Sequence, residues 1–458
     1  DDFFVVGHDL LLSATNFAKV SKSLLVPIHF LHLNPQDFDG CVPFYYVCRL
    51  QSLLLIICFM EFLILANKLP YPPNDGGAIA TLSMAKSLAE LGHRVSLLSM
   101  NTSKHFCNPT TIPPTLKQLI EFIAVDINTD ISVRSAFRNY FNTSIPYNAE
   151  RFITSEYNSK LTELLLSRHF DVIQMEGLYL GPYIRTIRKL SRSLISMRAH
   201  NVEHEIWQRT AAVAGGIKGL YLANLAKRIK RFETSMINNY DTLIPITGRD
   251  AGVFRKLGCN IPIHVAPTGV NTHNLEPDPD QAEFPSLFHI GALDWAPNQE
   301  GLRWFFNKVW HKVHKMCPNL KFYLAGRNAP RWFREINEPN VVFMGEVPDA
   351  HVFIRSKAIM IVPLFSGSGL RIKIIEGMAL GKAIVTTTIG TEGISSTYGE
   401  NIMIADDPER FAQAIFQLVE SEQLTRKLGS NAARFVRQYY DNSAITRSLV
   451  DFYSANLF

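Results

Sequence analysis

The sequence predicts an α/β fold with two Rossmann-like, doubly wound parallel sheets. After Met60, short apolar strands alternate with helices, which is typical of parallel sheets that helices cover on both faces. This series of units occurs twice, and a stretch at about 265–285 that is rich in proline and acidic residues separates the two series. The chain has 458 residues and exceeds the size at which one core stops growing, so at least two domains are expected.

The first series forms an N-terminal domain that we expect to span residues 60–270. It opens with a strand, a polar loop and a helix that Gly92 ends. Its strands are predicted at Glu61–Ala66, Arg94–Ser99, Asp171–Gln174, Leu194–Met197 and Thr242–Ile246. Its helices are predicted at Ala78–Leu91, Leu220–Asn238 and Arg249–Leu257.

The second series forms a C-terminal domain that we expect to span residues 271–435, followed by a helix at 436–458 that packs back on the N-terminal domain. Its strands are predicted at Phe288–Gly291, Leu320–Ala325, Val341–Phe343, Ala358–Pro363 and Ala383–Thr386. Its helices are predicted at Asn298–His314, at Leu370–Leu380 and from Pro408 onward.

Residues 1–59 show no sustained hydrophobic period. Their apolar run Leu53–Met60 is shorter than the ~20 residues that a membrane span needs. Neither a basic region nor a small-residue cleavage site marks a secretory signal there. We interpret residues 1–59 as a non-native extension before a start at Met60, with a membrane-associating leader as the alternative.

The composition excludes several classes of protein. Hydrophobic residues make up 47% and charged residues 19% of the chain, which is ordinary for a folded domain and wrong for a disordered one. The net charge of +5 is mild and scattered, and we expect no nucleic acid as a partner. The six cysteines have no metal-ligand or paired spacing, so the simplest location is a reducing cytoplasm.

Ligands of open parallel sheets bind beyond the carboxyl ends of the strands, so the loops that follow strands carry the candidate site. Gly76 and Gly77 follow the first strand and precede a helix. Glycines let the backbone approach a ligand closely, and the start of a helix favours an anion. A plain turn is the alternative interpretation of this pair.

A glycine loop at 366–369 stands between a predicted strand and helix of the second series. Backbone N–H groups from Gly369 and Leu370 can hold a diphosphate there, and Arg371 and Lys373 can neutralise it without a metal ion. Glu376 lies one to two turns into the helix, where a carboxylate can accept hydrogen bonds from two ribose hydroxyls. Glu392 follows the next strand and is expected to face the same pocket.

Polar and ionisable residues at 198–204 follow the predicted Leu194–Met197 strand. Packing does not explain such a concentration, and His200 can hydrogen-bond a sugar hydroxyl or transfer a proton. The order His200-x-x-Glu203-His204 also occurs in zinc proteases. Those need the motif on one helix face, whereas a strand immediately precedes it here, so we expect no metal site.

Taken together, these segments resemble the retaining GT-B glycosyltransferases of family 4, often called glycosyl transferases group 1, and above all bacterial members that build surface glycans. The match runs from about Glu61 to the C-terminus. It rests on PYPPNDGG, RAHNVEHEIWQR, LDWAPNQEGLRWF and GLRIKIIEGMALGKAIVTTTIGTEGI. The resemblance implies two facing Rossmann-like domains, with the donor bound mainly by the C-terminal one and the acceptor mainly by the N-terminal one.

Residue by residue, the resemblance places Gly77 beside the donor phosphates, His200 near the transferred sugar and Glu376 at the ribose. Two departures stand out. Ser368 occupies the position of the first glutamate in the family's E-x7-E signature, and the loop at 291–298 lacks the arginine and lysine that often cradle the diphosphate. We infer that Arg371 and Lys373 compensate.

The resemblance implies transfer with retained anomeric configuration through front-face attack, in which the leaving diphosphate takes the acceptor proton. We therefore expect a nucleotide-sugar donor, UDP- or GDP-linked, a glycan or lipid-linked acceptor, and no metal or other cofactor. A GT-B sugar-nucleotide epimerase and a catalytically silent partner subunit are the alternatives. The predicted helix at 220–238 carries the basic stretch Lys227–Arg231 together with apolar residues, namely Leu220, Tyr221, Leu222, Leu225, Ile229 and Phe232. This helix and the basic cluster at 185–192 lie in the acceptor half and suggest peripheral contact with an anionic membrane.

Overall fold

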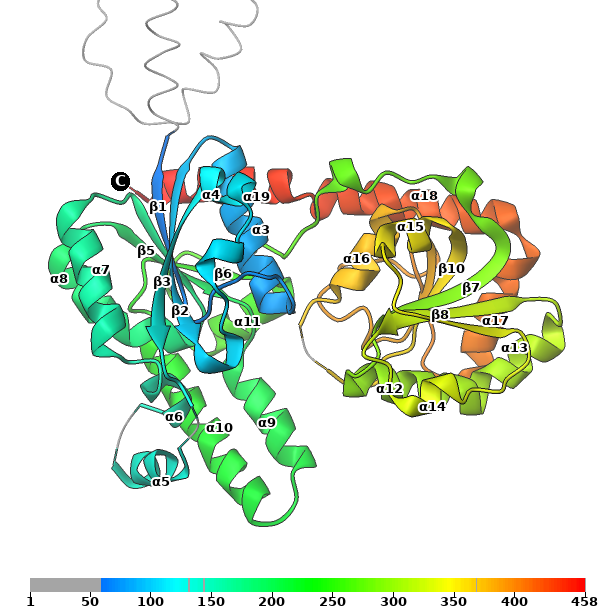
Figure 1. Cartoon of the computed structure of the whole chain (residues 1–458), viewed down its shortest axis with the longest axis horizontal. Coiled ribbons are helices and arrows are strands. Elements are labelled where there is room, and N and C mark those ends of the chain that lie inside the picture. The colour runs from blue at the N-terminus through cyan, green and yellow to red at the C-terminus, as the bar shows by residue number, and fades with distance from the viewer. Residues whose placement is uncertain (1–58, 131, 143–144, 368, 458) are drawn as a thin grey trace, which may run out of the picture. The chain divides into compact units, whose positions relative to one another are not determined.

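A computed structural model describes residues 59–130, 132–142, 145–367 and 369–457 (Figure 1). Residues 59–458 belong to one compact unit. The interpretation of residues 1–59 as an extension therefore falls almost entirely outside the described residues, and so does Ser368. No helix within the described ranges is long and apolar enough to cross a membrane.

The N-terminal half contains a six-stranded parallel sheet with the strand order β3-β2-β1-β4-β5-β6. Buried side chains on both faces form its core, as expected for strands that helices cover. The strands are β1 (Glu61–Ala66), β2 (Arg94–Thr102), β3 (Ile120–Ile127), β4 (Val172–Glu176), β5 (Leu194–Ala199) and β6 (Thr242–Pro245). The main helices are α3 (Gly76–Glu90), α5 (Val133–Asn142), α7 (Ser155–Ser167), α8 (Ile184–Leu190), α9 (Glu203–Val213), α10 (Gly216–Met236) and α11 (Gly248–Lys256).

The C-terminal half repeats the architecture, with the parallel strand order β12-β11-β10-β7-β8-β9. Its strands are β7 (Glu283–Ala292), β8 (Lys321–Arg327), β9 (Val341–Gly345), β10 (Lys357–Val362), β11 (Ala383–Thr386) and β12 (Met403–Ile404). Its helices include α12 (Ala296–Trp304), α13 (His311–Met316), α14 (Arg331–Arg334), α15 (Ala350–Arg355), α16 (Ile372–Ala379), α17 (Pro408–Glu420) and α18 (Glu422–Tyr439). These two sheets confirm the predicted fold class.

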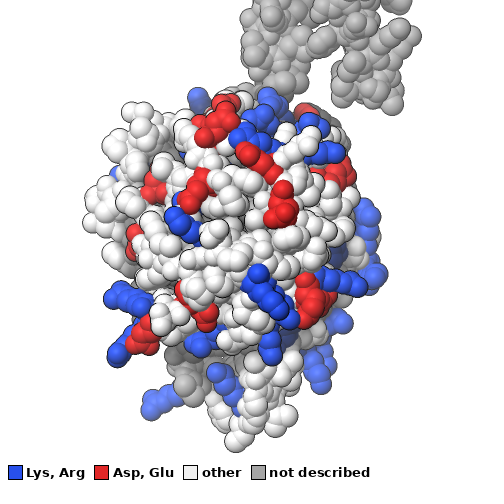
Figure 2. All heavy atoms as spheres, turned by 90° about the vertical axis from the view of Figure 1, so that its right-hand side faces the viewer, with Lys and Arg blue, Asp and Glu red and all other residues white. Residues whose placement is uncertain are grey.

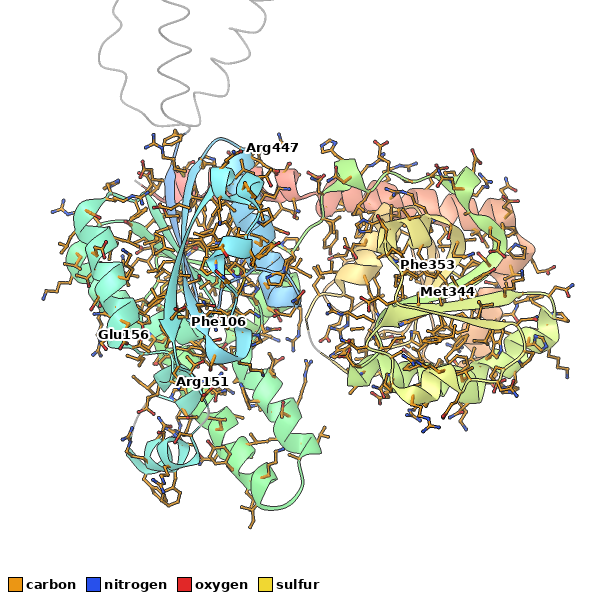
Figure 3. All side chains as sticks on the ribbon, in the orientation of Figure 1. Phe106, Arg151, Glu156, Met344, Phe353 and Arg447 are labelled. Carbon is orange, nitrogen blue, oxygen red and sulfur yellow. The ribbon has the colours of Figure 1, made fainter. Side chains whose placement is uncertain are left out.

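Aromatic side chains fill much of the second core. Phe353 of α15 lies in the C-terminal half (Figure 3). Its ring meets that of Phe288 of β7 edge to face, with ring centroids 5.8 Å apart. The middle of α12 lies so close to the end of β10 that a Cβ atom on Gly301 would fall 1.5 Å from the carbonyl oxygen of Pro363. Glycine at position 301 therefore lets this helix pack directly on the end of the strand.

The last helix, α19 (Asn442–Asn456), follows α18 and contacts α3 of the N-terminal half (Figure 1). Asp441 caps its first turn, and Val270 pairs with the same residue as an isolated bridge. Its Tyr453 is fully buried in the N-terminal core. The domain boundaries at 270 and 435 stay predictions.

Several element ends differ from the sequence-based expectation. The edge strand β3 was not predicted, because most of its side chains are only partly buried and its pattern is mixed. Strand β5 runs two residues further than expected, so Arg198 lies inside the sheet and not in the loop after it. Helix α3 starts at Gly76, because the side chain of Asp75 accepts a hydrogen bond from the backbone N–H of Ala78.

Candidate functional site

His200 follows β5 and lies against a carboxylate at the end of the neighbouring strand β4. The His200 Nε2 atom is 2.6 Å from Oε2 of Glu176. The guanidinium of Arg198 approaches the same oxygen at 3.5 Å, and the hydroxyl of Thr81 donates to it at 3.1 Å. The side chain of Glu176 is 3% exposed, whereas that of His200 is 16% exposed. The imidazole therefore connects a buried anion to the surface of the site.

The buried carboxyl of Glu176 is ionised. Burial alone would raise its pKa, but the charge of Arg198 and hydrogen bonds from His200 and Gln174 outweigh it and lower the pKa to about 2. An ionised carboxylate only accepts hydrogen bonds, so the Nε2 atom of His200 carries a proton. Glu176 thereby holds the imidazole through its Nε2–H group.

The predicted donor loop follows β10 and leads into α16. Gly367 and Gly369 have φ angles of 106° and 81°, which favour glycine. Gly369 lies opposite the N-terminal half, since a Cβ atom on it would fall 3.8 Å from Oδ1 of Asn201. Leu370 packs against Gly393, where an added Cβ atom would meet its Cδ1 at 3.4 Å.

Two cations, Arg371 and Lys373, lie where this loop leads into α16. Arg371 is 4% exposed and donates a 2.5 Å hydrogen bond from Nη1 to the carbonyl oxygen of Gly369. Lys373 donates from Nζ to Oδ1 of Asn298 at 2.7 Å. Burial and then the charge of Arg371 lower the pKa of Lys373 to about 7. The two positive charges repel each other, so an anion bound between the two side chains would stabilise both of them.

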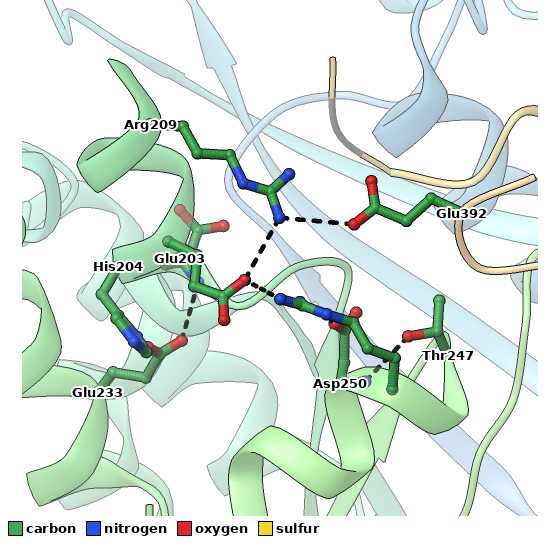
Figure 4. A network of polar contacts seen from close by, with 9 residues as sticks. Glu203, His204, Arg209, Glu233, Thr247, Asp250 and Glu392 are labelled. Atoms are coloured by element: carbon green, nitrogen blue, oxygen red, sulfur yellow. Dashed lines mark hydrogen bonds and ion pairs between the residues drawn. The ribbon is translucent and has the colours of Figure 1, made fainter. Parts of the chain in front are cut away.

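Glu392 follows β11 and reaches α9 of the N-terminal half. Its Oε1 atom lies 3.5 Å from Nη2 of Arg209 on α9, a contact between the two halves (Figure 4). The Glu392 carboxylate also favours the charged form of Arg371. Asn201, Arg209, Gly369 and Glu392 line one small pocket between the halves. The structure thus brings Gly369 and Glu392 to one pocket, together with Asn201 from the loop and Arg209 from the helix after β5.

Glu376 lies in a different pocket. Its Oε1 atom is 3.7 Å from Nε2 of His351 at the start of α15, and its side chain is 33% exposed. Hydrogen bonding to Glu376 raises the pKa of His351. Lys86 of α3 and Asn271 line the same pocket. Glu376, the fifth residue of α16, therefore presents a partly exposed carboxylate toward the N-terminal half, with His351 beside it.

Gly76 and Gly77 form the first turn of α3, next to an ion pair. The Nζ atom of Lys68 lies 2.6 Å from Oδ1 of Asp75, and an added Cβ atom on Gly77 would fall 3.6 Å from that Nζ atom. Arg327, at the end of β8, donates to the carbonyl oxygen of Asn74 at 3.1 Å. Since Arg327 belongs to the C-terminal half, the first loop after β1 also faces the cleft between the halves.

Glu203 and His204 belong to a separate polar cluster on α9 and α10 (Figure 4). The Nδ1 atom of His204 lies 2.5 Å from Oε2 of Glu233, whose other oxygen accepts from the backbone N–H of Glu203 at 3.0 Å. Burial and the nearby Glu233 charge raise the pKa of Glu203 to about 7, against the effect of a hydrogen bond from Tyr179. His204 and Glu203 therefore point to different partners from His200. Among the described residues, no three His, Cys, Asp or Glu side chains form a metal-binding group.

Sequence reasoning missed Glu176, Arg209 and His351. A glutamate at the end of the apolar stretch VIQME was a usable signal for Glu176, because a buried acid there needs a partner. No comparable signal marks Arg209 or His351. Both sit on helices, and their partners Glu392 and Glu376 are distant in sequence or lie on another element.

The two parallel sheets and the matching family models together support a glycosyltransferase of the GT-B type. Residues 74–274 match the family described as Glycosyltransferase Family 4, and residues 284–421 match the family described as Glycosyl transferases group 1. The chain belongs to the group 1 glycosyltransferases. The predicted resemblance is thereby confirmed at the level of the family and the fold.

Individual relatives agree with this assignment. The chain is 22% identical over 399 residues to a 44.6 kDa protein in the cps region of Klebsiella pneumoniae, covering 85% of this chain and 98% of that protein. Sucrose-phosphate synthase from Thermosynechococcus elongatus superposes with a TM-score of 0.63 at 17% identity, covering 86% and 98% of the two chains. Anabaena HepE in complex with UDP superposes with a TM-score of 0.59 at 14% identity, covering 86% and 100%. At these identities the solved structures show a shared fold.

We predict that Glu376→Ala weakens binding of a nucleotide sugar by about 2 kcal/mol, because a carboxylate that accepts hydroxyl hydrogen bonds is lost. Isothermal titration calorimetry with the donor measures this. Glu420→Ala removes an exposed glutamate from α17 of the same half and serves as the matched control. Equal affinities in the wild type and the Glu376 variant would remove Glu376 from the donor site.

Proposed function

We propose that this chain transfers a sugar from a nucleotide-sugar donor to a glycan or lipid-linked acceptor, with retention of the anomeric configuration and without a metal ion. The self-repelling pair Arg371 and Lys373 at the start of α16 carries the proposal. Both cations lie beside a glycine loop that faces Asn201 of the N-terminal half. A diphosphate is the anion that such a loop, helix start and cation pair would hold best.

The base of the donor is proposed from the relatives. Structures of Anabaena HepE are described as complexes with UDP and with UDP-glucose. We therefore favour a UDP-linked donor over a GDP-linked one. Glu376 would accept the ribose hydroxyls, with His351 beside it, and Gly77 would lie near the phosphates.

The proposed reaction needs little covalent chemistry from the protein. The acceptor hydroxyl attacks the anomeric carbon on the face that the diphosphate leaves, and the departing phosphate oxygen takes the hydroxyl proton. Arg371 and Lys373 would stabilise the charge that develops on this leaving group. His200, held by Glu176, would hydrogen-bond the transferred sugar and orient it.

Two alternatives have distinct products. A sugar-nucleotide epimerase would return an isomeric nucleotide sugar, whereas a silent subunit would bind no nucleotide. The paired cations and the Glu176–His200 pair favour the transferase over the silent subunit, because an unused site has no reason to retain charges at this energetic cost. Release of free UDP only when an acceptor is added, with a retained anomeric centre by NMR, distinguishes the transferase.

His200→Ala should lower kcat by roughly tenfold or more while the donor still binds, because the orienting group near the sugar is lost. Steady-state kinetics combined with donor titration separate the two effects. His311→Ala, at an exposed histidine on α13, is the control and should leave kcat unchanged. Full activity in the His200 variant would assign it a structural role.

Activity should persist in excess EDTA, because Arg371 and Lys373 supply the positive charge at the diphosphate. The measurement compares initial rates in EDTA with rates after addition of magnesium or manganese. Loss of turnover that either ion restores would contradict the metal-independent mechanism.

We propose a different surface for membrane contact from the one that the sequence suggested. Four of the apolar residues expected on the membrane side of α10 are buried in the core: Leu222, Leu225, Ile229 and Phe232. Exposed apolar side chains instead occur at the α9–α10 connection and on α5. They are Val213, Ile217, Leu220, Phe137 and Phe141, with exposures of 90%, 87%, 74%, 67% and 71%.

Charge supports this surface. Residues 206–232 contain six lysines and arginines and no acidic residue, and α5 adds Arg134 and Arg138, also without an acid. Arg228 joins the two segments by donating to Oδ1 of Asn139 at 2.8 Å. On the face of the C-terminal half in Figure 2, by contrast, acidic and basic side chains are interspersed. We propose that the α5 and α9–α10 region contacts an anionic bilayer from the cytoplasm.

Charge reversal of Lys227 and Lys230 should weaken binding of residues 60–458 to phosphatidylserine vesicles by about tenfold or more, at about 1 kcal/mol per cation. Co-sedimentation with phosphatidylserine and phosphatidylcholine vesicles measures it. Reversal of the exposed Lys308 and Lys315 in the other half is the matched control. Equally weak binding of the wild type to both lipids would favour a soluble acceptor.

A further inference from the structure

A chain of buried hydrogen bonds leads from the last helix to the carboxylate that holds His200. The hydroxyl of Tyr453 on α19 lies 2.9 Å from Oε1 of Gln174 and 2.9 Å from Oγ of Ser196. The amide of Gln174 then donates from Nε2 to Oε1 of Glu176 at 2.5 Å. Glu176 completes the chain through its other oxygen, which lies 2.6 Å from Nε2 of His200.

These bonds have one consistent set of directions. Ionised Glu176 can only accept, so the amide nitrogen of Gln174 must face it and the amide oxygen must face Tyr453. The hydroxyl of Tyr453 has a single proton and donates it in a hydrogen bond to the amide oxygen of Gln174. The hydroxyl of Ser196 must then donate to the phenolic oxygen of Tyr453. Tyr453 thus stabilises the same orientation of the Gln174 amide from the other end, because its hydroxyl donates to the amide oxygen while the amide nitrogen donates to Glu176.

Stability alone does not explain this chain. Tyr453, Gln174 and Ser196 are all fully buried, on elements whose other inward-facing side chains are mainly apolar. Apolar residues of similar volume would cost less there than a polar chain that needs every partner in place. The polar chain ends on a group at the surface of the site, and the bonds between its members leave little freedom to the Glu176 carboxylate.

We propose that Tyr453 is a positioning residue for His200, acting through Gln174 and Glu176. The inference rests on the proposed role of His200 in transfer. Tyr453 is fully buried, so it touches neither donor nor acceptor. It restricts the two oxygens of Glu176 to one orientation, and this orientation places the imidazole toward the transferred sugar.

Tyr453→Phe tests this role, because it removes the hydroxyl and preserves the ring. We expect kcat to fall by about three- to tenfold, while the affinity for the nucleotide sugar stays within about twofold of the wild type. Tyr157→Phe is the matched control. Tyr157 is also fully buried in the N-terminal half, and its hydroxyl donates to the backbone carbonyl of Leu98 at 3.0 Å, away from His200.

Tyr453→Phe loses the buried hydrogen bonds with Gln174 and Ser196, and Tyr157→Phe loses the one with Leu98, so the melting temperatures of the two variants report the structural cost separately from the kinetics. A positioning role requires a lower kcat in Tyr453→Phe at a Tm similar to that of Tyr157→Phe. Equal kcat values in the two variants would overturn it. A fall in kcat shared by both variants would also overturn it, because a general loss of stability would then be sufficient.

The His200→Ala background distinguishes failure of this inference from failure of the proposed function. If Tyr453 acts through His200, adding Tyr453→Phe to His200→Ala should change kcat by less than about twofold. Independent, multiplicative losses would contradict the connection while leaving the role of His200 intact. Unchanged kcat in His200→Ala alone would overturn both proposals.

Discussion

The buried carboxylate of Glu176 constrains much of the N-terminal half. A charge at this depth is stable only with close partners, and it receives Arg198 from the adjacent strand, Thr81 from α3 and His200 from the loop after β5. The parallel pairing of β4 with β5, which sets Glu176 against Arg198, makes this possible. The order of the strands therefore determines which imidazole is held at the cleft.

In the C-terminal half, by contrast, two cations lie close together. Arg371 and Lys373 are close enough for one charge to lower the pKa of the other, and the acid that affects Arg371, Glu392, is shared with Arg209. One half thus contains an anion with its own cations, and the other contains cations that favour an added anion. A nucleotide diphosphate in the cleft fits this distribution of charge, and the family assignment fits the same ligand.

Much of the site was predictable because it follows a local rule. Glycines and charged residues directly after apolar strands identified Gly369, Arg371, Glu376, Glu392 and the His200 loop. Other parts of the site depended on where strands and helices end, which local sequence patterns do not define. Arg198 was expected in a loop, yet β5 continues through it because its pairing with β4 and β6 extends that far. The apolar stripe of α10 likewise suggested a membrane contact, whereas tertiary packing buries most of it.

The sequence by itself determined the class of fold, the doubling of the Rossmann-like unit and the loops that carry the candidate site, because alternating strands and helices and strand-end glycines are local patterns. Tertiary structure decided which residues act together. His200 meets Glu176 across 24 positions, Arg209 meets Glu392 across 183, and Tyr453 meets Gln174 across 279. Such pairs arise from the order of parallel strands and the return of α19 to the first half. Neither hydrophobic period nor residue spacing along the chain contains that information.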